Sequence, residues 1–256
     1  MMTMLADQLV AGRPDELVVT DFEGIRLIIF NRPTARNALS NAMKRALVAC
    51  LDQAGTDDDV RIVVLTGAGA CFSAGADIKE LRAGAQPIRP HPGEALRAFG
   101  KPVIAAVDGP CATGALEVAL SCSFILASPK ARFADTHAKV GLIAGWGMSA
   151  LLPRAIGRRR ANQIMSTGEF IDAERAYDWG LVNEVVEGDV TERALEVARQ
   201  IAANPRASVE GQIGAMLEGD GASLGEALEI EERMKQCWRS GRTRLFATDP
   251  NTVPKT

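Results

Sequence analysis

The sequence has few of the residues that metal and disulfide sites require. It contains only two histidines, His91 and His137, so a histidine-based zinc site is not expected. The five cysteines are odd in number and show no CxxC spacing, which indicates reduced and mostly buried thiols rather than a disulfide framework. We therefore expect no metal site.

Signals for membranes and for nucleic acid are also missing. No apolar run reaches the roughly 20 residues that a membrane-spanning helix needs. The N-terminus lacks the charged and apolar blocks of a secretory signal. A net charge of −3 gives no basic field that would attract nucleic acid or a membrane surface. Together these absences predict a cytoplasmic protein that binds neither.

The chain of 256 residues suits one large domain, or one domain with a small appendage. Apolar segments typical of strands alternate with amphipathic segments through about residue 186, and the pattern is almost wholly helical from Asp189 onward. This order predicts an α/β core with parallel strand pairing and a helical C-terminal extension. We place the core at 1–195 and the helical region at 196–256, with a frayed tail at 248–256.

Local signals locate several elements. Gly24 lies between two apolar segments and predicts a hairpin, and Ser40 is positioned to cap a helix that extends to about Ala54. Residues 84–93 hold three prolines and two glycines, which indicates a mobile surface loop. The remaining expected elements are strands near 61–66, 101–107, 123–127 and 183–186, and helices at 148–165 and 173–179.

The segment 70–80 combines a strand, a loop of small residues and a helix that begins near Asp77. Free backbone N–H groups at such a helix start can bind a phosphate, a carboxylate or a developing oxyanion. The same order recurs at 102–121, where the loop 108–114 precedes a helix. The simpler alternative is that these glycines only permit tight turns between strand and helix.

Other familiar glycine-rich motifs do not match. The loops lack the GxGxxG of dinucleotide sites, the Gly-Lys-Ser/Thr of phosphate loops and the GxSxG of nucleophile elbows. If the two strand–loop–helix units pack side by side, two N–H donors can converge on one oxygen. Such a pair stabilises an enolate or a tetrahedral oxyanion.

Several motifs occur in a fixed order along the chain. They are Asn31-Arg-Pro with Arg36-Asn-Ala-Leu-Ser, Leu65-Thr-Gly-Ala-Gly, Phe72-Ser-Ala-Gly-Ala-Asp-Ile-Lys-Glu, Lys101-Pro-Val-Ile-Ala-Ala-Val-Asp-Gly, Thr167-Gly-Glu-Phe-Ile-Asp-Ala-Glu-Arg-Ala and Gly180-Leu-Val-Asn. Together these motifs resemble the crotonase family, the enoyl-CoA hydratase/isomerase superfamily, and the matching region extends from about residue 17 to 186.

The resemblance implies a spiral of ββα units with a helical C-terminal trimerisation region, assembled as a homotrimer or a dimer of trimers. It also implies an acyl-CoA thioester substrate, with coenzyme A as part of the substrate and no other cofactor. The oxyanion donors would be the backbone N–H groups of Ala76 and Gly114. The residues expected to contact the substrate are Arg36, Ala38, Ala74, Ala76, Asp77, Ile78, Lys79, Gly114 and Trp146.

The acid–base residues implied by the resemblance are Glu117 and the residue at position 137. Glu117 lies one helical turn beyond Gly114, within an otherwise apolar segment. Members that hydrate enoyl thioesters carry a second glutamate where this chain has His137. Histidine can still act as acid or base near neutral pH, and Asp135 is placed to orient it. The alternatives are an exposed helix glutamate and a histidine that only lines the pocket.

Trp146 occupies a position where the family commonly has small residues. The indole either reshapes the acyl pocket or packs into the core beneath the following helix. The resemblance therefore predicts an enoyl-CoA hydratase-like lyase that uses Glu117 and His137 as acid–base residues. The alternatives are another crotonase reaction, such as isomerisation or thioester hydrolysis, and a non-catalytic acyl-CoA-binding protein.

Overall fold

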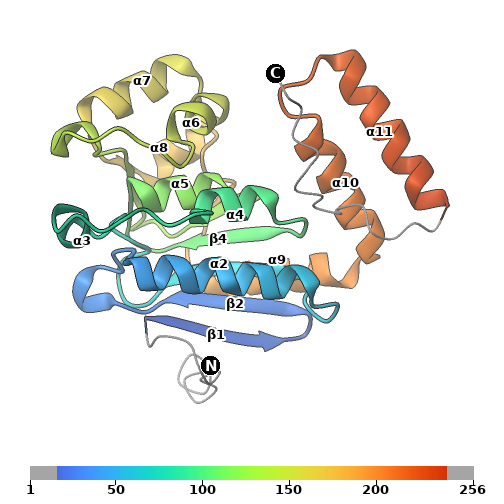
Figure 1. Cartoon of the computed structure of the whole chain (residues 1–256), viewed down its shortest axis with the longest axis horizontal. Coiled ribbons are helices and arrows are strands. Elements are labelled where there is room, and N and C mark those ends of the chain that lie inside the picture. Colours follow the sequence, from blue (N-terminus) through green and yellow to red (C-terminus); the bar gives the residue numbers. More distant parts are fainter. Residues whose placement is uncertain (1–15, 241–256) are drawn as a thin grey trace.

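The computed structural model describes residues 16–240, which form a six-stranded sheet covered on both faces by helices (Figure 1). The strand order is β1-β2-β3-β4-β6-β9, and only the β1–β2 pair is antiparallel. The predicted hairpin is confirmed, with Gly24 at φ +78° in its turn. The strands are β1 (Leu17–Phe22), β2 (Ile25–Phe30), β3 (Ile62–Gly67), β4 (Val103–Val107), β6 (Phe124–Ala127) and β9 (Glu184–Val185).

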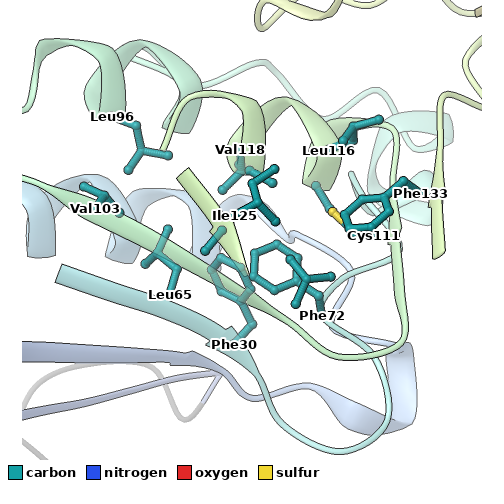
Figure 2. Close-up of a cluster of buried hydrophobic side chains, with 14 of the residues drawn as sticks. Phe30, Leu65, Phe72, Leu96, Val103, Cys111, Leu116, Val118, Ile125 and Phe133 are labelled. Carbon is teal, nitrogen blue, oxygen red and sulfur yellow. The ribbon is translucent and has the colours of Figure 1, made fainter. Parts of the chain in front are cut away.

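Alternate residues of the central strands enter two separate cores. In β3, Val63 and Leu65 face the larger core, whereas Ile62 and Val64 face the smaller one. Strands buried on both faces read as continuous apolar runs, which is why the sequence shows no polar alternation there. Figure 2 shows the larger core, where the rings of Phe30 and Phe72 meet edge to face with centroids 5.4 Å apart.

Helices on the larger-core side are α2 (Asn41–Thr56), α4 (Pro92–Ala98), α5 (Gly114–Leu120), α6 (Met148–Ile156) and α7 (Arg158–Thr167). The Ser40 hydroxyl accepts a hydrogen bond from the Met43 N–H, so the predicted cap of α2 is confirmed. The helix expected near Asp77 is α3 (Ile78–Arg82), which Asp77 caps, and the helix expected at 173–179 is α8 (Ala173–Asp178), which Asp172 caps.

A second, three-stranded sheet was not predicted. It pairs β5 (Pro110–Ala112) with β7 (Arg132–Ala134), and β7 with β8 (Ile171–Asp172). Part of the expected loop 108–114 is therefore a strand. Strands of two or three residues carry no periodic signal, because they are shorter than one repeat of the alternation that identifies a strand.

The prediction for residues 84–93 is correct only in part. Residues 84–90 lie mostly at the surface, but His91, Pro92 and Gly93 are buried. His91 caps α4, and Pro92 occupies its first turn, where a missing N–H costs nothing. The prolines therefore mark the start of a helix as well as the end of a loop.

The C-terminal region is helical, as predicted, and consists of α9 (Val190–Ala203), α10 (Arg206–Glu218) and α11 (Leu224–Arg239). Helix α9 covers the smaller core with Val190, Ala194, Leu195 and Ala198. Figure 1 shows α10 and α11 side by side and away from the sheet. The expected tail at 248–256 lies outside the described residues. Between residues 16 and 240, no helix is long and apolar enough to cross a membrane.

Candidate active site

The two glycine-rich loops lie against each other. A Cβ atom on Gly75 would lie 1.9 Å from Thr113 Oγ1 and 3.2 Å from the nitrogen of Gly114. Gly75 also has φ +92°, so only glycine permits this approach. The N–H of Ser73 donates to the C=O of Pro110 at 3.1 Å, which fixes the register of one loop on the other. The structure thus brings together the two units that the sequence predicted separately.

The N–H groups of Ala76 and Gly114 have no acceptor within the described part of the chain. The residues on either side of Ala76 bond Leu39 in a parallel bridge, which turns the N–H of Ala76 away from Leu39. Gly114 is the first residue of α5, so its N–H has no partner within the helix. Thr113 precedes it with φ +51°, a backbone conformation that non-glycine residues rarely adopt and that often occurs at functional sites.

Glu117 is buried on the first turn of α5, with 1% of its surface exposed. Its Oε1 accepts hydrogen bonds from the N–H groups of Trp146 at 2.6 Å and Met148 at 3.1 Å. The other oxygen, Oε2, lies 3.8 Å from Nε2 of His137. One oxygen is therefore held by the backbone, and the other faces the histidine. The exposed-glutamate alternative is wrong.

His137 is held by Asp135, as the sequence suggested. Nδ1 of His137 lies 2.5 Å from Oδ1 of Asp135, which is itself buried. Asp135 also accepts the backbone N–H of His137 at 3.1 Å. A proton on Nδ1 is shared with Asp135, so Nε2 of the neutral ring is a free base directed at Glu117. The order Asp135, His137, Glu117 forms a continuous row of titratable groups.

The surroundings raise the pKa values of both central groups. Burial raises the pKa of Glu117, and the N–H donors of Met148 and Trp146 and the charge of His137 offset this only in part. Burial acts to lower the pKa of His137, but the hydrogen bond and charge of Asp135 and the charge of Glu117 raise it above its usual value. The pair thus retains a proton to higher pH than two exposed groups would.

Trp146 lies against Gly114 and contacts the larger core. A Cβ on Gly114 would lie 3.0 Å from Cζ3 of the indole and 3.4 Å from the nitrogen of Ala76. The ring stacks on His91, with centroids 5.6 Å apart. The C=O of Trp146 accepts from Arg97 at 2.7 Å, which anchors its backbone. The indole therefore borders the two candidate oxyanion donors.

The residues expected to contact CoA gather on one side of these loops. The N–H of Ala74 donates to the C=O of Arg36 at 2.9 Å, which joins the turn 36–38 to the loop 73–77. The Asp77 carboxylate is used internally, because it caps α3 and pairs with Arg32 at 3.0 Å, and these bonds outweigh burial and lower its pKa. Exposed backbone or side chains remain at Arg36, Ala74, Ile78 and Lys79, and Ala38 is partly exposed.

Sequence reasoning missed three buried polar residues near this site. Asn37 is fully buried at φ +52°, and its amide donates to the C=O groups of Ala68 and Cys71, which secures the first loop. Lys44 and His91 are 5% and 6% exposed. The one available signal was Lys44 on the apolar face of α2, three residues before Leu47. For residues 16–240, no group of three or more potential ligands could hold a metal ion.

Known proteins match this chain over most of its length. The family model for enoyl-CoA hydratase/isomerase matches residues 20–241. The 2,3-dehydroadipyl-CoA hydratase of Escherichia coli is 35% identical over 225 residues, covering 86% of this chain and 88% of that protein. The 4-chlorobenzoyl coenzyme A dehalogenase-1 of Arthrobacter is 34% identical over 222 residues, covering 82% and 80%.

A crystal structure of an enoyl-CoA hydratase from Mycobacterium tuberculosis superposes with a TM-score of 0.83 at 30% identity and covers 90% of this chain and 95% of that one. The match confirms the expected mixed α/β fold with C-terminal helices. Both the sequence model and the structure extend over nearly the whole described chain. The protein therefore belongs to the enoyl-CoA hydratase/isomerase, or crotonase, family, whose substrates are acyl-CoA thioesters.

Proposed function

We propose that this protein is an enoyl-CoA hydratase-like enzyme that adds water to a trans-2-enoyl-CoA. One observation carries the proposal. A buried glutamate, Glu117, faces Nε2 of His137 at 3.8 Å, one helical turn from the unpaired N–H of Gly114. Hydration needs a base for water, an acid for carbon and donors for an enolate oxygen, and this arrangement offers all three.

The proposed chemistry begins at the thioester carbonyl, whose oxygen accepts from the N–H groups of Ala76 and Gly114. Water attacks the β-carbon, its proton passes to the Glu117–His137 pair, and the electron pair of the double bond moves to the carbonyl oxygen. The enolate collapses when the pair delivers a proton to the α-carbon. One water is added, and the pair ends with the proton count it began with, so the step balances.

The gap between Glu117 and His137 suits a water molecule. Their facing atoms are 3.8 Å apart, too far for a direct hydrogen bond. A water beside the line that joins them can lie about 2.8 Å from each, the usual hydrogen-bond distance. Glu117 is the main acid–base group and His137 an auxiliary one. We place the CoA moiety along Arg36, Ala38, Ala74, Asp77, Ile78 and Lys79, and the acyl group beside Trp146.

We also propose that region 196–256 assembles the enzyme as a homotrimer or a dimer of trimers, next to a core of residues 1–195. Helices α10 and α11 expose large apolar side chains, among them Met216, Leu224, Leu228 and Trp238. Such a surface is typical of a protein–protein interface. Light scattering of the purified protein tests this assembly. A cytoplasmic location stays a prediction from the sequence.

Other crotonase reactions remain the second candidate, because relatives of similar identity carry different names. The E. coli protein is called a hydratase and the Arthrobacter protein a dehalogenase. A short-chain trans-2-enoyl-CoA should lose its conjugated thioester absorbance on addition of this protein. Tight binding of CoA thioesters without turnover would instead support simple acyl-CoA binding, and would overturn the hydratase proposal.

A further inference from the structure

In the described part of the chain, three N–H donors without a hydrogen-bond acceptor lie on or beside the indole of Trp146. They are the ammonium of Lys44, Nε2 of His91 and Nε1 of Trp146 itself, which we call the donor cluster. Nζ of Lys44 lies 5.7 Å from the ring centroid, and His91 stacks on the ring with its centroid 5.6 Å away. Three segments far apart in the sequence thus place hydrogen-bond donors around one side chain.

The Lys44 ammonium is buried without a hydrogen bond or ion pair to any residue in 16–240. Burial lowers the pKa of Lys44, and the charges of Glu80 and Asp77 act against that shift from a distance. Both acids are already engaged, because Glu80 accepts the Asn41 N–H at 2.7 Å and Asp77 pairs with Arg32. A buried ammonium normally has a partner, so this one calls for an acceptor beyond residues 16–240, such as a bound ligand.

The buried imidazole of His91 presents a second donor. Its Nδ1 accepts the Glu94 N–H at 3.1 Å, which places the proton of the neutral ring on Nε2. Burial lowers the pKa of His91, so the neutral ring prevails near pH 7. Nε2 lies 3.9 Å from Oε2 of Glu94, beyond hydrogen-bond distance. The N–H of His91 therefore also lacks an acceptor among residues 16–240.

The donor cluster adjoins the proposed reaction centre. The Trp146 indole reaches to 3.0 Å from a Cβ built on Gly114, and the Trp146 N–H holds Glu117. A ligand atom near this ring would belong to the acyl part of a bound thioester, because the phosphates of CoA lie along the exposed loop in the proposed binding mode. The group that fits a buried cation and a neutral N–H donor is a carboxylate.

We propose that Lys44, His91 and Trp146 form a subsite for a carboxylate at the distal end of the acyl group, so that the preferred substrate is an enoyl-CoA derived from a dicarboxylic acid. The inference rests on the proposed function and specifies its substrate class. Lys44 supplies the charge and His91 the neutral donor. Lys44 and His91 both lie next to the indole, which borders the oxyanion donors.

The test compares two trans-2-enoyl-CoA thioesters of equal chain length, one ending in a methyl group and one in a carboxylate, at several chain lengths. The wild type should favour the carboxylate by about 10- to 100-fold in kcat/KM, the range expected for a charge-assisted hydrogen bond in a buried site. Lys44→Met should remove most of that preference. Arg45→Met, which removes an exposed charge from the next position of the same helix, should leave the ratio unchanged.

Calorimetric binding of the matching saturated thioesters separates this inference from the proposed function. If neither enoyl substrate turns over but the carboxylate-bearing thioester binds about tenfold tighter, hydration fails and the subsite stands. If both enoyl substrates turn over equally well and both saturated thioesters bind equally, the subsite is refuted and hydration stands. The wild-type ratios decide the matter even if Lys44→Met does not fold.

Discussion

Two buried charges lie on either side of Trp146, and the fold treats them differently. The Glu117 carboxylate accepts two backbone N–H groups and faces His137. Lys44 is also buried, with 5% of its surface exposed, but its ammonium has no acceptor anywhere in residues 16–240. A buried charge that has hydrogen-bond partners in its own protein needs none from the substrate. A buried charge without such partners favours a ligand that supplies one.

The largest effect should come from removing the satisfied charge. Glu117→Gln keeps an oxygen for the Trp146 and Met148 N–H groups but abolishes proton transfer. We expect kcat for enoyl-CoA hydration to fall on the order of 10³- to 10⁴-fold, since general acid–base catalysis contributes up to about that much. Calorimetry should show CoA thioester binding nearly intact. Glu174→Gln, an exposed change on α8, is the matched control, and equal rates for both variants would refute the role of Glu117.

The next effect should follow from closing the space between Trp146 and the oxyanion donors. Gly114→Ala would place a Cβ 3.0 Å from the indole and 3.4 Å from the nitrogen of Ala76, so one of them must shift. We expect kcat to fall about 10²-fold, comparable to the loss of one oxyanion donor. Gly145→Ala serves as the control, because its Cβ would meet no atom within 4 Å. Steady-state rates that do not separate the two variants would count against the oxyanion assignment.

A smaller effect should come from the group behind His137. Asp135→Asn removes the charge and the strong acceptor that raise the pKa of His137, so the Glu117–His137 pair will hold its proton less firmly. We expect about a tenfold loss of rate and a pH profile of kcat/KM displaced to lower pH, since orienting partners of catalytic histidines have effects of this size. A profile that stays in place would show that His137 takes no part in proton transfer.

The smallest effect concerns stability. The folded protein raises the pKa of Glu117, so between the ordinary and the raised pKa the folded state binds more protons than the unfolded state. The stability that this proton gives is complete below the ordinary pKa and is lost as the pH rises through the raised one. The side chain that Glu117→Gln introduces does not titrate, so the variant keeps this contribution at every pH. Its free energy of unfolding should therefore rise by about 1 kcal/mol relative to that of the wild type between acid and neutral pH, a typical single-residue effect. Urea unfolding at several pH values measures the difference, and parallel curves would contradict it.

Much of the fold could be predicted from local signals. Ser40 caps α2 where its hydroxyl predicted a helix start, and α3 begins near Asp77 as expected. The apolar segments 61–66, 101–107, 123–127 and 183–186 correspond to the parallel strands β3, β4, β6 and β9. The second sheet and helix α4 escaped prediction. The first has strands of two or three residues, and the second begins inside a proline-rich segment that also resembles a loop.

Some residues of the candidate site could be placed from the sequence, and others could not. The spacing from Gly114 to Glu117 and from Asp135 to His137 is short, so one turn of chain sets the geometry, and the structure places these residues as the sequence suggested. The orientation of Trp146 was open between two alternatives. The indole in fact contacts both Gly114 and the core, which depends on a loop and a helix that meet only in the folded protein.

The sequence by itself determined the α/β class and the two glycine-rich loops, because each depends on residues close together in the chain. The tertiary structure alone decided that Gly75 meets Thr113 and that Lys44 and His91 flank Trp146. Those contacts join separate segments, and no local pattern records whether a buried donor will find an acceptor. The packing that closes the core also leaves the Lys44 ammonium without an acceptor in residues 16–240.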